Sequence, residues 1–313
     1  MATKGADEKS TPEAKSHYQK KMAVQAMGIM NVSEGKELAL AFQGKENMNQ
    51  DPQTIKEIMK WDMWSPWASY YELYSTHPLT AKRINAIGTH ALSLGQEPWV
   101  IFDSEKPESY WDDFIIDLFV VFLPEILGIG FVATKFILVS YGTENINWFD
   151  LVIPLIFGFS AGGIIKTMQM YPGGNFSNYS IVSLLKKINV SQVRSYPVKI
   201  TGRIIGRGDA GNIFSEDMII RDKTGIIFLD HEPFGFNLFF ALFRIDRFRG
   251  VDVEVEGWYR RSPKPYVEVK RIYSRSDSSR SYTYYYQLLA WIAFSVIAFL
   301  SWNYIFLPVL RTP

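Results

Sequence analysis

Long apolar stretches separate the polar segments of this chain. The three longest are Phe114–Ser140, Trp148–Met168 and Leu288–Leu310. An α-helix needs about 20 predominantly apolar residues to cross the hydrocarbon core of a bilayer. Each stretch is therefore predicted to form a transmembrane helix. The last is the clearest of the three, because it contains no charged residue.

The first 113 residues show helical spacing and helix-start signals. Capping residues precede predicted helices at Thr11, Ser33 and Asp51, and Pro78 precedes a fourth helix that should end before Gly95. Such side chains accept hydrogen bonds from the free N–H groups of a first helical turn. The expected apolar stripes are Ile55, Ile58 and Met59 in the third helix and Ile84, Ile87 and Ala91 in the fourth.

From Pro197 onward the apolar residues alternate with polar ones, which is typical of half-buried strands. Five strands are predicted, at residues 198–203, 218–221, 226–229, 251–256 and 266–272. Short antiparallel strands with one long middle connection favour a small OB-like barrel. The connection, Pro233–Arg247, is unusually apolar. It is expected either to close one end of the barrel as a helix or to insert into the membrane interface or a partner.

These patterns predict an α+β membrane protein with four parts. A helical head covers residues 1–113, and a two-span transmembrane hairpin covers residues 114–170. An OB-like antiparallel β domain follows over residues 171–275. Residues 276–313 form a connector and a third transmembrane helix.

The distribution of lysine and arginine predicts how the spans are oriented. Residues 1–113 contain twelve of these cations and residues 171–287 contain eighteen, whereas residues 141–147 contain none. Basic loops stay on the cytoplasmic side of a membrane. We therefore expect an integral protein of the cytoplasmic (inner) membrane, with the head and the β domain cytoplasmic. The tail from Arg311 should lie on the opposite face.

Composition narrows the classes of partner. The net charge of +1 excludes a globally basic nucleic-acid binder. The absence of cysteine excludes disulfides and thiolate chemistry. Within residues 171–280, eighteen Lys and Arg stand against twelve Asp and Glu. Attraction to anionic lipid headgroups, about 1 kcal/mol per basic residue, accounts for this excess, so no nucleic acid is expected as a partner. Met1–Ser10 is polar and charged, unlike a signal peptide.

Candidate catalytic chemistry is sparse. The four histidines, His17, His77, His90 and His231, include no pair spaced i, i+4, and no H-E-x-x-H occurs. No G-x-S-x-G elbow supports a serine nucleophile. Structural roles are expected for all four histidines. Glu125 is a candidate for a proton relay or a partner contact, because an acidic group at membrane depth is costly, and Lys166 could approach it.

Two regions carry a family resemblance. Residues 72–84 have the sequence ELYSTHPLTAKRI. The β domain contains GRIIGRG at 202–208, FSEDM at 214–218 and GWYRR at 257–261. The first resembles the S-T-H-P segment that closes the protease domain of HtpX-type membrane zinc metallopeptidases. The others resemble the β domain appended to some members of that family.

The resemblance itself argues against catalysis by this chain. Members of the family bind zinc through H-E-x-x-H and a later glutamate, and the best-matching ligand run here places His17 and Lys21 at the acidic positions. We therefore expect no zinc, no other cofactor and no enzymatic activity. The leading hypothesis is a non-catalytic accessory or scaffold subunit of a larger membrane complex, related to a metallopeptidase-like ancestor.

Two alternatives remain open at this point. One is the substrate-binding or regulatory half of a split membrane zinc peptidase, and the other is a lipid- or nucleic-acid-binding membrane module. In the scaffold hypothesis, other integral membrane subunits are the partners, and the third span packs on one of them. Its candidate contact residues are Trp291, Ser295, Trp302 and Asn303. Small residues allow close helix approach, and a buried amide needs a partner in lipid.

Overall fold

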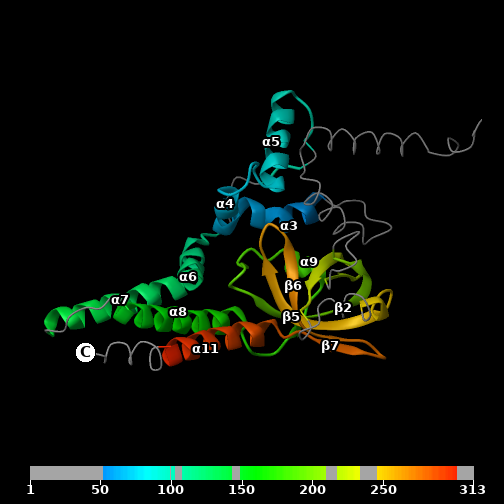
Figure 1. The fold of residues 1–313 in the computed structure, drawn as a ribbon. Helices are drawn as coiled ribbons and strands as arrows, with labels where there is room; N and C mark the ends of the chain where they lie inside the picture. Colours follow the sequence, from blue (N-terminus) through cyan, green and yellow to red (C-terminus); the bar gives the residue numbers. More distant parts are fainter. Residues whose placement is uncertain are drawn as a thin grey trace, which may run out of the picture.

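Three parts make up the molecule in the computed structural model (Figure 1). A helical head lies above a β-barrel, and three long helices extend away from the barrel on one side. The structure describes residues 52–98, 100–102, 108–142, 149–208, 217–232 and 245–301. The helices predicted at Thr11 and Ser33, and most of the apolar connection Pro233–Arg247, lie outside these residues.

The head is formed by α3 (Pro52–Trp64), α4 (Pro66–Glu72) and α5 (Thr80–Ser93). Ile55 and Met59 of α3 are buried against α5 and the extended segment that follows it, as the apolar spacing predicts. Ile58, the third residue of that predicted stripe, is also buried, but it belongs to the core of the barrel. One helix therefore contributes to two cores and joins the head to the barrel.

Helix α5 confirms the predicted helix before Gly95, which takes a positive φ of 69° at the helix end. Its buried face differs from the predicted stripe. Ile87 is 46% exposed, whereas Gly88 is buried against the returning chain. A Cβ added at Gly88 would lie 2.6 Å from the carbonyl oxygen of Val100. Close backbone approach, and not apolar periodicity, sets this face of the helix.

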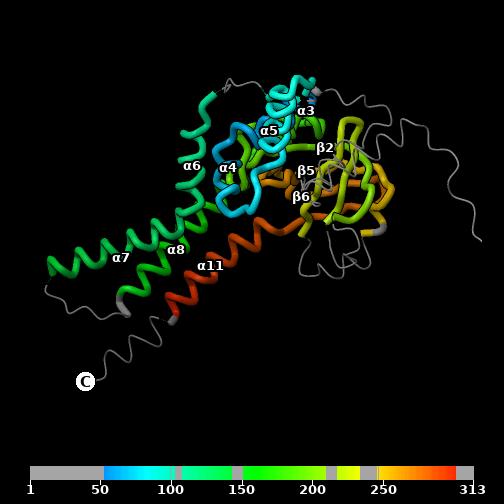
Figure 2. Tube along the Cα trace, turned by 90° about the horizontal axis from the view of Figure 1, so that it is seen from above, coloured from blue at the N-terminus to red at the C-terminus, as the bar shows by residue number. Residues whose placement is uncertain are grey.

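The first predicted span is corrected by the structure. Residues 114–140 do not form one helix, because they are divided between α6 (Trp111–Val121) and α7 (Leu123–Tyr141). Pro124 occupies the first turn of α7, where its missing N–H costs nothing and its fixed φ suits a helix start. In both views α6 runs at a steep angle to α7 (Figures 1 and 2).

The other two long helices are α8 (Phe149–Met170) and α11 (Thr283–Ser301). Together with α7 they are long and apolar enough to cross a membrane. The second predicted span is confirmed as a helix, and the third begins five residues earlier than predicted. The three helices lie side by side in both views, with α8 contacting α7 and α11 (Figures 1 and 2).

Glycines on α8 permit this close packing. A Cβ added at Gly158 would lie 2.3 Å from the carbonyl oxygen of Leu127, and one at Gly162 would lie 2.5 Å from that of Leu123. The spacing is that of the G-x-x-x-G motif, in which small residues let two helix backbones meet. The adjacent Gly163 faces α11 and provides the space for the Trp291 ring.

Five strands close into a barrel and confirm all five strand predictions. They are β2 (Tyr196–Arg207), β3 (Met218–Arg221), β4 (Ile226–Asp230), β5 (Asp252–Arg261) and β6 (Pro265–Tyr273). β2 pairs antiparallel with β3 and with β5, β3 pairs antiparallel with β4, and β5 pairs antiparallel with β6. A parallel pairing of β4 with β6 completes the closure.

Short elements cover the barrel and extend its edges. α9 (Ile181–Leu185) precedes the first barrel strand and buries its apolar residues in the barrel core. β1 (Ser177–Asn178) adds to β2, β7 (Ser278–Arg280) adds to β6, and the 3-10 turn η2 (Ile245–Arg247) precedes β5. The core is filled mainly by inward-facing Val, Ile and Leu side chains, as the alternating sequence pattern requires.

Substitution of Gly162 by leucine should destabilise the packing of α7 on α8. The larger side chain would overlap the backbone of Leu123, and overpacking of this kind costs about 1–3 kcal/mol. Thermal unfolding of the detergent-solubilised chain measures the effect. Gly130→Leu on α7 is the matched control, since a Cβ there meets no atom within 4 Å. Equal melting temperatures for the two variants would contradict the packing described here.

Candidate functional site

Three polar junctions fasten the head, the barrel and the long helices together. In the first, Asp117 of α6 is buried and its carboxylate accepts three hydrogen bonds. The donors are Trp67 Nε1 at 3.0 Å, Ser191 Oγ at 2.7 Å and Arg194 Nε at 2.9 Å. Trp67 belongs to the head, whereas Ser191 and Arg194 lie just before the barrel. Asp117, which falls within the first predicted span, is therefore a structural acceptor in α6, outside the three helices that are long and apolar enough to cross a membrane.

Arg194 is shared between two acidic residues of α6. Besides Asp117, it forms an ion pair with Asp113 and donates from Nη2 to the Asp113 carbonyl oxygen at 3.0 Å. Burial disfavours the charged guanidinium, but hydrogen bonds and charges from Asp117 and Asp113 outweigh it. The pKa of Arg194 therefore lies above its ordinary value. Its charge offsets one of the two negative charges that α6 presents to it.

The second junction joins the head to the end of β5. Arg261 is buried and donates to two backbone carbonyls, that of Leu185 at 2.5 Å and that of Ile58 at 3.1 Å. Its Nη2 lies 3.5 Å from a carboxylate oxygen of Asp62, and its guanidinium stacks 5.0 Å from the ring centroid of Trp61. All but Leu185 belong to α3, so one arginine ties α3 to the barrel.

The third junction joins the barrel to the end of α8. Arg260 of β5 is buried with Glu268 of β6, and its Nε donates to the Glu268 carboxylate at 2.7 Å. The same guanidinium donates to the Met170 carbonyl oxygen at 2.8 Å and to that of Gln192. The Tyr171 hydroxyl donates to the other Glu268 oxygen. Both charges are satisfied, as buried charges must be.

Tyr171, the first residue after α8, connects this junction to α11. Its hydroxyl accepts a hydrogen bond from Gln287 Nε2 at 3.1 Å. Its ring packs edge-on against Trp258 at 4.9 Å and Tyr284 at 5.4 Å between centroids. Burial and the neighbouring carboxylate of Glu268 raise the pKa of Tyr171 above its ordinary value. The phenol therefore remains a protonated donor.

The proposed partner contacts on α11 divide between described and undescribed residues. The Trp291 ring packs at the Gly163 position of α8 and lies 6.0 Å from the Phe159 ring. Ser295 is partly buried and lies one helical turn further along the same face. Trp302 and Asn303 lie outside the described residues. The face that contains Trp291 is thus used to pack α11 on α8 within the chain.

The acidic residue singled out in the first span, Glu125, is exposed in the first turn of α7. Lys166 of α8 interacts electrostatically with Glu125, in agreement with the prediction that the two residues approach each other. The Lys166 ammonium group donates to the Val121 carbonyl oxygen at 2.9 Å. This bond places the cation at the junction of α6 with α7, where a helix end leaves a carbonyl free.

The histidines are scattered. His77 and His90 are exposed, whereas His231 is buried with Nε2 2.9 Å from Ser279 Oγ. His17 and Lys21 lie outside the described residues. Within the described part of the chain, no group of three His, Cys, Asp or Glu side chains could hold a metal ion.

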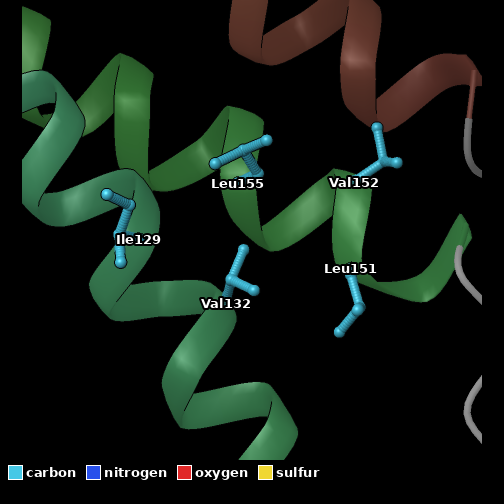
Figure 3. Close-up of a pocket in the computed structure, with 5 residues that line it drawn as sticks. All are labelled: Ile129, Val132, Leu151, Val152 and Leu155. Carbon is cyan, nitrogen blue, oxygen red and sulfur yellow. The ribbon is translucent and has the colours of Figure 1, made fainter.

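Among the described residues, an open apolar groove of about 410 Å³ lies between α7 and α8 (Figure 3). It is lined by Ile129, Val132, Leu151, Val152 and Leu155. No polar atom among these side chains could orient a substrate.

Comparisons with protein-family models, with curated proteins and with solved structures give no significant match for this chain.

Sequence reasoning missed the roles of the junction residues. Arg260 and Arg261 were noted within the GWYRR motif, but neither was assigned a contact. A signal was present nonetheless. Arg260 and Glu268 lie diagonally on adjacent strands joined by a short turn, since Arg260 is paired with Tyr266 and Glu268 with Trp258. Opposite charges this close in strands of otherwise apolar or alternating pattern indicate an ion pair between the strands.

Replacing Arg260 with alanine should destabilise the protein strongly. Glu268 would keep a buried charge without its partner, and breaking one side of such a pair costs about 3–5 kcal/mol. Chemical denaturation of the full chain in detergent measures this loss. Arg203→Ala removes an exposed ion pair with Asp252 on the same barrel and should leave the midpoint nearly unchanged. A similar loss of stability in both variants would show that the buried pair contributes no more than the exposed one.

Proposed function

We propose that this chain is a non-catalytic scaffold subunit of a larger membrane complex. The three long helices span the bilayer, and the head and barrel are held at its cytoplasmic surface. The observation that carries the proposal is the set of arginine junctions, in which Arg260 and Arg261 are buried and Arg194 is partly buried. They join the head and the barrel and fix the barrel to α8. A rigid platform at a membrane surface is suited to positioning partners.

The arrangement of the parts agrees with the proposed orientation. The head and the barrel lie at the same end of the three helices, where α7 begins, α8 ends and α11 begins (Figures 1 and 2). Residues 1–113 contain twelve Lys and Arg and residues 171–287 contain eighteen, whereas the connection 141–147 contains none. The positive-inside rule places such segments in the cytoplasm. The connection between α7 and α8 and the end of the chain then lie across the membrane.

The barrel is best described as OB-like. Its strand order, β2-β3-β4-β6-β5 with closure of β5 on β2, places a long connection between the third and fourth strands. OB barrels commonly bind oligonucleotides through the loop between their last two strands. Here Arg260 and Arg261, which precede that loop, are occupied by α8 and α3. This use favours a structural role for the barrel over nucleic-acid binding.

The metallopeptidase-like ancestry is part of the proposal. Within the family-like segment, Glu72 caps α5 by accepting from the Leu79 N–H at 2.9 Å and also pairs with Lys82. Ser75 Oγ donates to the His77 carbonyl oxygen at 2.8 Å. These contacts stabilise the local fold of the segment, so the proposal of a chain that does not cleave peptides still gives the segment a structural role.

A partner subunit would contact the exposed face of α11. Trp291 and Ser295 face α8, so the opposite face is available. It presents large apolar side chains along the whole described helix: Leu289, Ile292, Val296, Ile297 and Leu300. Between helices in lipid, close van der Waals packing is the driving force, and a continuous apolar face can supply it.

Isolation of the tagged chain from its native membranes in mild detergent tests the scaffold. We expect defined integral membrane proteins to co-purify. Ile297→Trp adds bulk at a position that is 61% exposed and should lower their yield by roughly tenfold, equivalent to about 1.4 kcal/mol. Ile137→Trp, on the exposed side of α7, is the matched control and should retain them.

Two results would overturn the proposal. Co-purification of a single zinc protein with H-E-x-x-H, with peptidase activity only in the pair, would establish the split peptidase instead. Recovery of the chain alone from gently solubilised membranes would show that it is not a subunit. In either case the melting temperature of each variant should be measured, so that loss of partners is not confused with loss of folding.

A further inference from the structure

A β-bulge places two cations together on the outer face of the barrel. Between β5 and β6, Arg271 is paired with Glu256, and Val269 is paired with Gly257, the next residue of β5. Lys270 therefore has no partner in the register and is the extra residue of the bulge. A bulge of this kind redirects side chains and often occurs beside a functional site. Val269 is buried, whereas Lys270 and Arg271 are both partly exposed.

A third cation faces them from the edge strand. Arg280 of β7 is the direct partner of Arg271 in the antiparallel pairing of β6 with β7. Side chains of paired residues lie on the same face of a sheet, and like charges in this position repel each other. Such an arrangement is unfavourable unless an anion lies between or above the two guanidinium groups.

Aromatic and hydroxyl groups hold these cations without neutralising them. Arg271 donates to the Tyr273 hydroxyl at 2.7 Å, and Arg280 donates to the Tyr285 hydroxyl at 2.6 Å. The Lys270 ammonium lies 4.3 Å from the centroid of the Phe176 ring. These contacts position the side chains while their positive charges persist.

The carboxylates nearest along the strands already have partners. Glu256, opposite Arg271, lies 3.2 Å from the Lys199 ammonium. Glu268 is bound to Arg260 in the third junction. Among the described residues, neither carboxylate forms an ion pair with Lys270, Arg271 or Arg280. Lys199 is shared with Glu254 at 2.9 Å, and no ion pair within the described residues neutralises the three cations, which lie on the paired strands β6 and β7.

The position of the cluster identifies the source of the anion. The Lys270 carbonyl oxygen accepts from the Ser281 N–H at 3.1 Å, two residues before α11 begins at Thr283. On the other side, Lys270 lies 5.8 Å from the ring centroid of Trp258, which packs on Tyr171 at the end of α8. The cluster therefore lies between the exit of one span and the entry of the next. This is the depth of lipid headgroups, where Tyr and Trp are enriched.

We propose that Lys270, Arg271 and Arg280 form a binding site for the phosphate group of an anionic phospholipid. Arginine guanidinium groups match phosphate oxygens in geometry, and a phosphate above the pair would remove the repulsion between Arg271 and Arg280. The acyl chains would run along α8 and α11. The inference rests on the proposed membrane-spanning topology and adds a specific lipid to it.

Lipid enrichment tests the site with the full chain. The protein is reconstituted into vesicles of phosphatidylcholine with a minor fraction of phosphatidylglycerol and then extracted in mild detergent. Mass spectrometry measures the ratio of the two lipids that remain bound. We expect phosphatidylglycerol to be enriched roughly tenfold over the vesicle ratio, because three basic residues act at the leaflet surface. In the triple variant Lys270→Gln, Arg271→Gln, Arg280→Gln, the ratio should fall to that of the vesicles.

A charge-matched control uses exposed cations elsewhere on the barrel. Lys223→Gln, Arg249→Gln, Lys264→Gln removes the same charge and should keep the enrichment. Equal loss in both triple variants would mean that net charge alone attracts the lipid, and full retention in the first would place the site elsewhere. Either result overturns the proposal.

Two further measurements separate the possible failures. Inorganic phosphate added to protein in pure phosphatidylcholine vesicles should leave the melting temperature unchanged. The melting temperature is also measured in vesicles that contain phosphatidylglycerol. If inorganic phosphate raises the melting temperature as much as phosphatidylglycerol does, the ligand is a soluble phosphate and the lipid assignment is wrong. Resistance of the chain to alkaline extraction from vesicles tests spanning itself. Extraction of the wild-type chain would refute the proposed topology, whereas retention without lipid enrichment would refute only this site.

Discussion

The ion pair between Arg260 and Glu268 constrains more of this molecule than any other contact. Two buried charges are stable only when every polar atom around them has a partner. The barrel alone does not supply enough of these partners. The Met170 carbonyl and the Tyr171 hydroxyl, both at the end of α8, complete the set. The barrel strands and α8 therefore cannot rotate independently without exposing one of these charges or leaving it without a partner.

The elements that could be predicted from sequence are those with local causes. All five barrel strands follow from alternation of apolar and polar residues, because a strand places successive side chains on opposite faces. The end of α5 follows from Gly95, which adopts a positive φ. The exposed Ile87 shows the limit of this reasoning. The buried face of α5 is determined by the close approach of the backbone near Val100. The spacing of apolar residues does not reveal that contact.

The junctions could not be predicted because their causes are distant in sequence. Asp117 lies within an apolar run and was assigned to a membrane span by length and hydropathy. Its carboxylate is instead satisfied by Arg194, which is 77 residues away. The partners of Arg261 include Ile58, which is 203 residues away. The α8 glycines offered a further local signal, besides the charged residues Arg260 and Glu268, since Gly158 and Gly162 have the spacing of a helix-packing motif.

Helix α6 shows how these constraints act together. Its inner face is fixed by Asp117, and the exposed opposite face presents Trp111, Ile115 and Phe119 at helical spacing. Helix α6 is steeply inclined to α7, which begins at Leu123 (Figures 1 and 2). In the proposed topology, in which α7 spans the bilayer, α6 would lie at the membrane surface with its apolar face at the boundary of headgroups and acyl chains. The head would then be attached to the bilayer by α6 and to the barrel by Arg194, which would give the proposed platform a defined orientation.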